Sequence, residues 1–125
     1  MKFSCNQQIL SKALNTVSKA VSSRTTIPIL KGILLEASSD GNLKLAASDL
    51  DLSIEKTVAV NVLEEGSIVV SAKLFIDIIR KLPNEEVEVE ESEGSVTIRC
   101  LASEFTIVGQ PADEFPNIGE IKEET

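Results

Sequence analysis

One order of segments occurs twice along this chain: a strand, a helix and three further strands. The first unit runs from residue 2 to about residue 62, and the second from about residue 67 to residue 108. Residue identity between the two halves is weak, so the repeat lies in the pattern of apolar residues. Two such units can pair around a pseudo-twofold axis with both helices on one side. The pattern therefore predicts an α+β fold, a duplicated β-α-β-β-β unit with two helices packed on antiparallel sheets.

Apolar spacing indicates the elements of the first unit. Leu10, Leu14 and Val17 follow the helical period, and Asn6 is a suitable cap for the helix that they predict. The run Asp-Gly-Asn at 40–42 is a hairpin turn signal. In this unit we expect a strand over 2–5, a helix over 7–22 and strands over 29–37, 43–45 and 52–62.

The second unit has the same kinds of signal. Phe75, Ile78 and Ile79 share one face of a helix, Ser71 can cap that helix, and Pro83 stops it. We expect a strand over 67–70, a helix over 72–82 and strands over 87–91, 95–101 and 104–108. Residues 110–125 contain two prolines and a glycine and are expected to form a loop or linker.

Charge is unevenly distributed along the chain. The net charge of −8 by itself argues against a nucleic-acid partner. However, the first 35 residues contain five basic residues and no acidic one, whereas the rest of the chain contains seven basic and twenty acidic residues. One part of the surface can therefore be basic while the remainder repels polyanions.

Both predicted helices carry basic residues at helical spacing. Lys12 and Lys19 are seven residues apart in the first helix, as are Lys73 and Arg80 in the second, so each pair shares a helix face. Arg24 follows the first helix, and residues 6–24 contain no acidic residue. Solvation alone explains any one of these residues, but together they predict contacts with phosphates, which carry no sequence information. The scarcity of aromatic residues, four Phe and no Trp or Tyr, argues against single-stranded nucleic acid.

Side chains that carry chemistry are few. The chain has no histidine and only two cysteines, Cys5 and Cys100, which we interpret as reduced thiols; we expect no metal site, no cofactor and no catalytic residue. Asp49 and Asp51 form a pair of carboxylates, but no base accompanies them, and the acidic run 85–91 is expected to be a solvated strand face. No apolar run is long enough for a signal peptide or a membrane span, so we expect a cytoplasmic protein without a membrane partner.

Several longer motifs carry a family resemblance. Met-Lys-Phe opens the chain, Arg-Thr-Thr-Ile-Pro-Ile-Leu stands at 24–30, and Ala-Ser-Asp-Leu-Asp-Leu stands at 47–52. Phe-Ile-Asp-Ile at 75–78, with the arginine at 80 and Leu-Pro at 82–83, marks the second helix, and Ala-Asp-Glu-Phe-Pro-Asn stands at 112–117. Over residues 1–118 the chain resembles the N-terminal domain of the bacterial DNA polymerase III beta subunit, the beta sliding clamp. Residues 119–125 would then begin an interdomain linker.

The resemblance implies a non-catalytic processivity factor of bacterial DNA replication. In this family each chain has three such domains, and two chains meet head to tail in a ring that encircles double-stranded DNA and tethers DNA polymerase III. Arg24 matches a DNA contact of the family, and Lys12, Lys73 and Arg80 match basic positions of its channel; Lys19 is included on spacing alone. The pocket for polymerase and clamp-loader peptides lies on later domains, so this chain is expected to be a domain-sized fragment.

The last strand of the second unit matches one half of the ring-closing interface. Phe105 and Ile107 match its apolar anchors, and alternation puts them on one strand face; the alternative is that they belong to the core of the domain itself. Some relatives flank this phenylalanine with basic residues for ion pairs, whereas this sequence has Ala, Ser and Glu directly before it. Arg99, further back, is the remaining basic candidate for the interface, and the electrostatic part of ring closure is in question.

Two other functions remain open from the sequence. One is a small acidic protein-interaction domain whose basic helix faces are incidental. The other is a hydrolase that uses Asp49 and Asp51. A clamp predicts that the reading frame continues beyond residue 125 with two more copies of the pattern, and neither alternative does.

Overall fold

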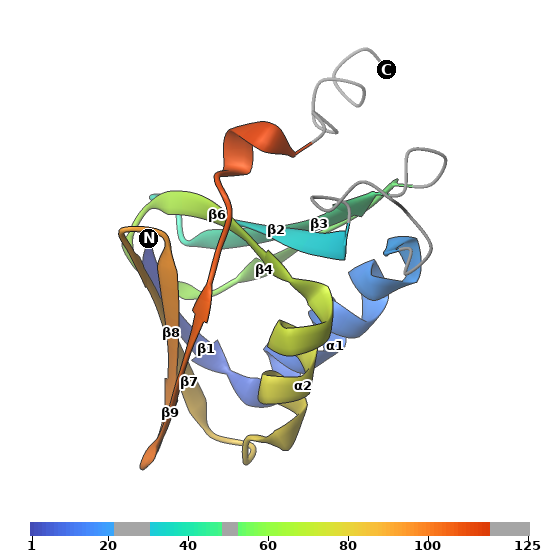
Figure 1. Ribbon diagram of the computed structural model, residues 1–125. Helices are drawn as coiled ribbons and strands as arrows, with labels where there is room; N and C mark the ends of the chain where they lie inside the picture. Colours follow the sequence, from blue (N-terminus) through green and yellow to red (C-terminus); the bar gives the residue numbers. More distant parts are fainter. Residues whose placement is uncertain (22–30, 49–52, 116–125) are drawn as a thin grey trace.

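The computed structural model describes residues 1–21, 31–48 and 53–115 (Figure 1). Its elements follow the order that the repeated pattern predicts, with one additional strand, β5. They are β1 (Lys2–Asn6), α1 (Gln7–Val17), η1 (Ser18–Ala20), β2 (Gly32–Ser38), β3 (Asn42–Ser48), β4 (Ser53–Ala59), β5 (Asn61–Glu64), β6 (Gly66–Ser71), α2 (Ala72–Lys81), β7 (Glu86–Ser92), β8 (Ser95–Cys100), β9 (Ser103–Val108) and η3 (Ala112–Glu114).

The strands form two antiparallel sheets, and each unit gives its first strand to the sheet of the other. One sheet has the order β5-β1-β7-β8-β9 and the other the order β4-β3-β2-β6. Strand β1 therefore pairs with β7, for example Phe3 opposite Val89, and β6 pairs with β2, for example Val70 opposite Ile33. The predicted α+β class is confirmed. The exchange of first strands relates the two units to each other in the same way in both directions, as a pseudo-twofold arrangement requires.

The two helices lie side by side in the angle between the sheets (Figure 1). One apolar cluster joins the helices to both sheets, and no Trp or Tyr contributes to it because the chain contains none. Its largest fully buried side chains include Phe3 of β1, Leu10 and Leu14 of α1, and Phe75 and Ile79 of α2. Burial of this shared cluster is the main force that holds the helices on the sheets.

Side-chain caps begin both helices, as the sequence predicts. Asn6 accepts hydrogen bonds from the backbone N–H groups of Gln8 (2.9 Å) and Ile9 (3.4 Å), and Ser71 accepts one from Leu74 (3.3 Å). A further contact ties the helices together: the buried side-chain amide of Gln7 donates to the carbonyl oxygen of Ile79, 2.7 Å away. The start of α1 is thereby fixed against the last turn of α2.

The predicted helix over 7–22 is too long. The α-helix ends at Val17, and Ser18–Ala20 continue as a 3-10 turn in which the N–H of Val21 donates to the carbonyl oxygen of Ser18 (3.0 Å). The side chain of Ser18 donates to the carbonyl oxygen of Asn15 (2.9 Å), which competes with continued helical bonding at this end. The apolar spacing continues through Val21, so periodicity alone could not show the change.

The prediction of a single strand over 52–62 is also wrong. The structure has two strands in this segment, and they belong to different sheets. Strand β4 ends at Ala59, and β5 begins at Asn61 and pairs with β1. Between them the N–H of Val60 donates to the carbonyl oxygen of Gly41 (2.9 Å) instead of continuing a ladder. Alternation persists on both sides of this crossing, which is why the sequence pattern looks unbroken.

Part of the segment predicted as loop or linker is docked on the domain. Gln110 forms a two-way backbone bridge with Val69, with N···O distances of 2.8 and 2.9 Å. Phe115 is buried against Ala46 and Val69 on the outer face of the second sheet. The chain therefore crosses from β9 to the outer side of the β4-β3-β2-β6 sheet before residue 116.

The two cysteines are buried free thiols, as the sequence suggested. Burial, and secondarily the charge of Glu86, raises the pKa of the Cys5 thiol to about 12. Since the unfolded thiol ionises near pH 9, the unfolded chain loses this proton first, and stability should fall as the pH rises from about 9 to about 12.

We expect Cys5 to resist alkylation at pH 8 in the folded chain. A rise of about three pH units in its pKa lowers the thiolate fraction about a thousandfold, and only the thiolate reacts. Iodoacetamide labelling followed by peptide mass spectrometry measures this, with the chain unfolded in urea as the control that should react at once. Labelling of Cys5 at similar rates in both conditions would contradict the burial of this thiol.

Candidate functional site

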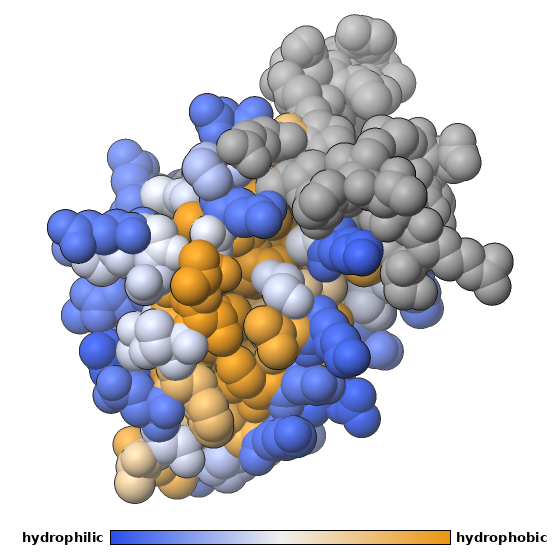
Figure 2. Space-filling model, viewed as in Figure 1, coloured by the Kyte–Doolittle hydropathy of each residue, from blue (hydrophilic) through white to orange (hydrophobic). Residues whose placement is uncertain are grey.

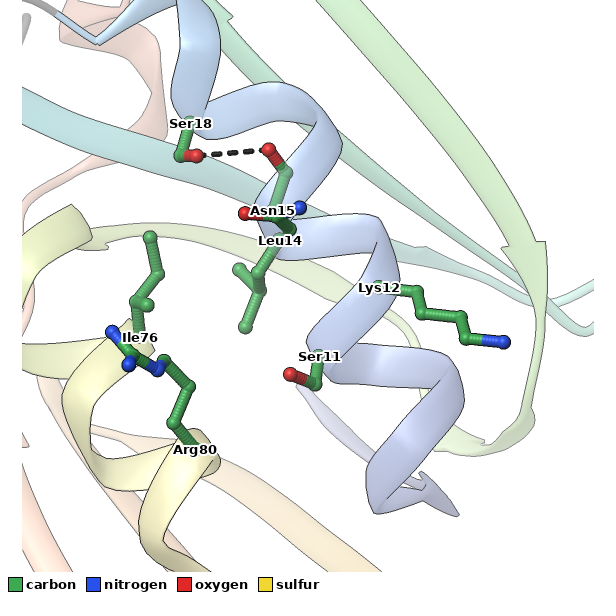
Figure 3. A pocket seen from close by; sticks show the side chains of 7 residues that line it. All are labelled: Ser11, Lys12, Leu14, Asn15, Ser18, Ile76 and Arg80. Atoms are coloured by element: carbon green, nitrogen blue, oxygen red, sulfur yellow. Dashed lines mark hydrogen bonds between the residues drawn. The ribbon is translucent and has the colours of Figure 1, made fainter.

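A hollow on the helix side lies between α1 and α2. It has a volume of about 530 Å³ and is lined by Ser11, Lys12, Leu14, Asn15, Ser18, Ile76 and Arg80 (Figure 3). We call this hollow the interhelix groove. Apart from Leu14 and Ile76 at its base, its lining offers hydroxyl, amide and cationic groups and no carboxylate.

Helix packing determines which side chains reach the groove. In α1 the buried stripe contains Leu10, Ala13, Leu14 and Val17, and Lys12 lies outside this stripe and is exposed. In α2 Phe75 and Ile79 face the core. Ile76 and Arg80, four residues apart, lie on the flank of α2 that turns toward α1.

The cations of the helices and the cations of the sheets differ in their partners. Within the described ranges, no ion pair includes any of the helix-side cations Lys12, Lys19, Lys73 and Arg80. On the sheets, by contrast, Lys2, Lys44 and Arg99 all pair with glutamates. The helix side therefore keeps its positive charge available for an external anion, while the outer sheet faces neutralise theirs.

The structure brings together only part of the predicted basic set. Lys12 and Arg80 line the same groove, although Figure 3 shows Lys12 extending from the side of α1 that is turned away from α2. Lys19 in η1 and Lys73 in the first turn of α2 are exposed but do not line the groove. Arg24, with the motif over 24–30, lies outside the described residues. With Lys81 at the end of α2, five exposed cations thus lie on α1, η1 and α2 without forming one compact cluster.

A second exposed feature is strand β9, which forms one edge of its sheet. Phe105 and Ile107 stand directly opposite Ile98 and Val96 of β8, so they point toward the core side of the sheet. Ile107 packs against the core, whereas 41% of Phe105 remains exposed. The two residues therefore differ. Ile107 belongs in part to the core of the domain, whereas Phe105 is exposed at the sheet edge, where a partner could contact it.

The sequence did not indicate the apolar residues of α2 that accompany this edge. Leu74 is 51% exposed, and Ile78, one turn later, is half-buried. Ile76 lines the groove on the α1 side, and Leu74 and Ile78, each two residues from it, therefore lie on the opposite flank of α2. Figure 2 shows apolar surface between β9 and α2. We call Leu74, Ile78, Phe105 and Ile107 the edge patch. The sequence does carry one signal for this patch. Leu74 is a large apolar residue that lies one position before Phe75, outside the set of α2 residues that face the core.

Arg99 is held within its own sheet. Its Nη1 donates to Glu88 and Glu90 (3.1 Å each), and its Nε donates to Glu104 (3.3 Å). We call these four residues the Arg99 cluster. The hydrogen bond to Glu90 is the largest of the effects that raise the pKa of Arg99. The glutamates of β7 thus lie on a solvated face of the strand, as predicted. Two of them, Glu88 and Glu90, share the guanidinium of Arg99.

The remaining candidates give no site in the described part of the chain. Asp49 and Asp51 lie outside the described residues. Within residues 1–21, 31–48 and 53–115, no three His, Cys, Asp or Glu side chains are grouped so that they could hold a metal ion. No described helix has the length and apolar character needed to cross a membrane.

Comparison with known families accounts for the motifs and the fold together. A family model described as DNA polymerase III beta subunit, N-terminal domain, matches residues 1–119. The chain belongs to this family. The predicted resemblance to beta sliding clamps is confirmed.

Named relatives agree in sequence and in structure. The beta sliding clamps of Halalkalibacterium halodurans and Bacillus subtilis are each 42% identical to this chain, over 99% and 98% of it and 35% of their own length. A crystal structure of the Bacillus subtilis DNA polymerase sliding clamp matches 94% of this chain and 33% of its own, with 41% identity and a TM-score of 0.90. A DNA polymerase III beta subunit from Eubacterium rectale matches with a TM-score of 0.91, 40% identity and coverage of 94% and 32%. The DNA-clamp fold is thereby confirmed, and the chain spans about a third of the length of these relatives.

Proposed function

We propose that this chain is the first domain of a ring-shaped sliding clamp that encircles duplex DNA and tethers DNA polymerase III during replication. In this proposal the domain acts as part of a closed ring that cannot leave the DNA sideways, and it contributes no catalytic residue. Residues 1–118 form the domain, and residues 119–125 begin the linker to the next one. Membership of the beta-subunit family supports the proposal, as does the match to about a third of each sliding clamp.

One observation carries the DNA side of the proposal: among the described residues no ion pair includes a cation of α1, η1 or α2, whereas Lys2, Lys44 and Arg99 of the sheets pair with glutamates. In these helices Asp77 is the only acidic residue, whereas the strands carry most of the carboxylates. A surface of this kind attracts phosphates without reading bases, and a few such contacts are weak enough to permit sliding. The acidic outer sheets keep DNA from binding to the wrong face.

The edge patch supports the assembly side of the proposal. An edge strand presents unpaired backbone groups, and Phe105 and Leu74 add exposed apolar surface beside it. We propose that β9 is where a second copy of the full-length protein joins head to tail. Contacts with the polymerase and the clamp loader would come from the two thirds of the relatives' length that this chain does not match.

We expect the full-length protein carrying both Lys12→Ala and Arg80→Ala to bind duplex DNA with a weaker salt dependence. Each lost phosphate contact lowers the slope of log affinity against log salt by about 0.9, and a dimer loses each contact twice. Fluorescence anisotropy with a duplex, over a series of NaCl concentrations, gives this slope. The matched control is Lys44→Ala, which removes a charge from the outer sheet face, where Lys44 pairs with Glu36.

Two results would speak against DNA-facing helices. One is an equal loss of affinity in Lys44→Ala and in the helix variants, which would mean that only net charge matters. The other is unchanged binding in all variants. That outcome would favour the acidic protein-interaction domain, whose basic helix faces have no partner.

A further inference from the structure

Residues 109–115 join the two sheets by a route separate from the helices (Figure 1). The N–H of Gly109 donates to the carbonyl oxygen of Gly94, in the turn between β7 and β8 (2.7 Å). The N–H of the next residue, Gln110, donates to the carbonyl oxygen of Val69 in β6, which belongs to the other sheet (2.8 Å). Two consecutive residues are therefore bonded to different sheets. We call residues 109–115 the strap.

The first residue of the strap lies directly against the sheet that it crosses. A Cβ atom added at Gly109 would come within 2.6 Å of Cγ1 and 2.9 Å of Cδ1 of Ile68, a buried residue of β6. Carbon atoms in a packed interior do not approach each other so closely, so only glycine fits here without a shift. A larger side chain would lift the strap or displace Ile68.

The strap is held at its two ends rather than along its middle. Pro111 and Asp113, in the middle, are exposed. At the far end Phe115 is only 7% exposed and packs on apolar residues of β2, β3 and β6. The turn η3 directs Phe115 onto the sheet, because the N–H of Phe115 donates to the carbonyl oxygen of Ala112 (3.0 Å). Phe115 is therefore the anchor that keeps the strap in place.

The strap adds a directional link to an apolar one. The helices fill the angle between the sheets through the shared core, and apolar contact of this kind is non-directional. The hydrogen bonds of Gly109 and Gln110, by contrast, depend on angle and join both sheets within two residues. Strand β9 ends at Val108, directly before the strap, so a shift of the strap moves the end of this edge.

We infer that the strap fixes the orientation of the two sheets relative to each other and, through it, the direction in which the β9 edge faces. Gly109 and Phe115 are positioning residues, since neither lines the interhelix groove nor belongs to the edge patch. The step from sheet orientation to assembly rests on the proposed function. A ring closes only if each joint has the correct angle, so a loose strap makes closure less favourable.

Hydrogen exchange of the full-length protein, measured by mass spectrometry of its peptides, tests the strap itself. In Phe115→Ala we expect the amides of residues 66–71 and 103–110 to exchange at least about tenfold faster, and those of α1 and α2 to stay within about threefold of the parent. Gly109→Ala, which keeps the anchor, should give the same local pattern. Val108→Ala is the matched control: Val108 is 82% exposed beside the strap, and all rates should stay within about threefold.

The dimer dissociation constant, measured by fluorescence-detected sedimentation over a dilution series, tests the effect on assembly. We expect Phe115→Ala and Gly109→Ala each to raise it at least about tenfold. Phe115→Leu keeps an apolar anchor and should stay within about threefold of the parent, as should Val108→Ala.

The possible failures are distinguishable. Faster exchange in every peptide of Phe115→Ala would mean that Phe115 serves stability alone, and unchanged exchange in residues 103–110 would mean that the strap does not hold β9; either result overturns the inference. Local loosening with an unchanged dissociation constant would overturn the step from sheet orientation to assembly. A parent protein that stays monomeric at every concentration would overturn the proposed ring, while the exchange rates would still decide whether the strap holds β9.

Discussion

Replacing Phe75 with alanine is expected to lower the free energy of unfolding of the chain by about 3–5 kcal/mol. Phe75 is fully buried on α2, in the cluster that joins both helices to both sheets. Truncation removes its transfer free energy and leaves a cavity that neighbours on rigid strands cannot fill. Since a domain of this size is stable by only about 5–15 kcal/mol, the loss is a large fraction of the total.

Urea unfolding monitored by circular dichroism measures this effect. Phe75→Leu is the matched control: it keeps most of the apolar volume and should cost markedly less than the alanine variant. Leu63→Ala is a second control, because Leu63 is 52% exposed on β5 and its loss should be small. Equal effects for Phe75→Ala and Leu63→Ala would contradict the position of Phe75 at the centre of the core.

Replacing Phe105 with aspartate in the full-length protein is expected to weaken the dimer at least about a hundredfold, or about 2.7 kcal/mol. Phe105 is the exposed aromatic residue of the edge patch, and a carboxylate in its place would be buried without a partner when the ring closes.

Val108→Asp is the control for this change. Val108 lies on the same strand and is 82% exposed, but it stands opposite Ser95 and so points to the outer face of the sheet. The two variants introduce the same charge three residues apart on opposite faces. Sedimentation of both should show a dimer for Val108→Asp and dissociation for Phe105→Asp, and the reverse result would place the interface on the outer face.

The sequence predicted the elements best where a local signal defines them. Asn6 and Ser71 cap their helices because their side-chain oxygens reach backbone N–H groups two or three residues ahead, which depends on nothing distant. The strands β7, β8 and β9 were correct to within one residue or so, since alternation and turns bound them on both sides. The helix side was predicted to be basic from spacing, and Lys12 and Arg80 do share a groove.

The sequence failed where the outcome depends on partners far along the chain. Alternation shows that β1 is a strand but not that its neighbour is β7, so the exchange between units was invisible. The same limit hid the crossing at Val60, where the pattern continues while the chain changes sheets. Arg99 stays a prediction for the ring interface, but the sequence could not show that three carboxylates surround it, because this depends on the register of β7, β8 and β9. Leu74 was missed because exposure depends on what else packs beside the helix.

The exchange of first strands also determines when this domain can form during synthesis. Strand β1 leaves the ribosome first, but its neighbour β7 follows only after two helices and five strands have been made. Neither half can complete a sheet alone, because each lacks the strand that the other holds. Pairings between such distant segments close slowly, and the nascent chain must keep the apolar side of β1 away from other contacts until then. A duplicated unit of this kind therefore folds as one piece or not at all, which makes the whole domain, and not its repeat, the smallest part that could be exchanged between clamps.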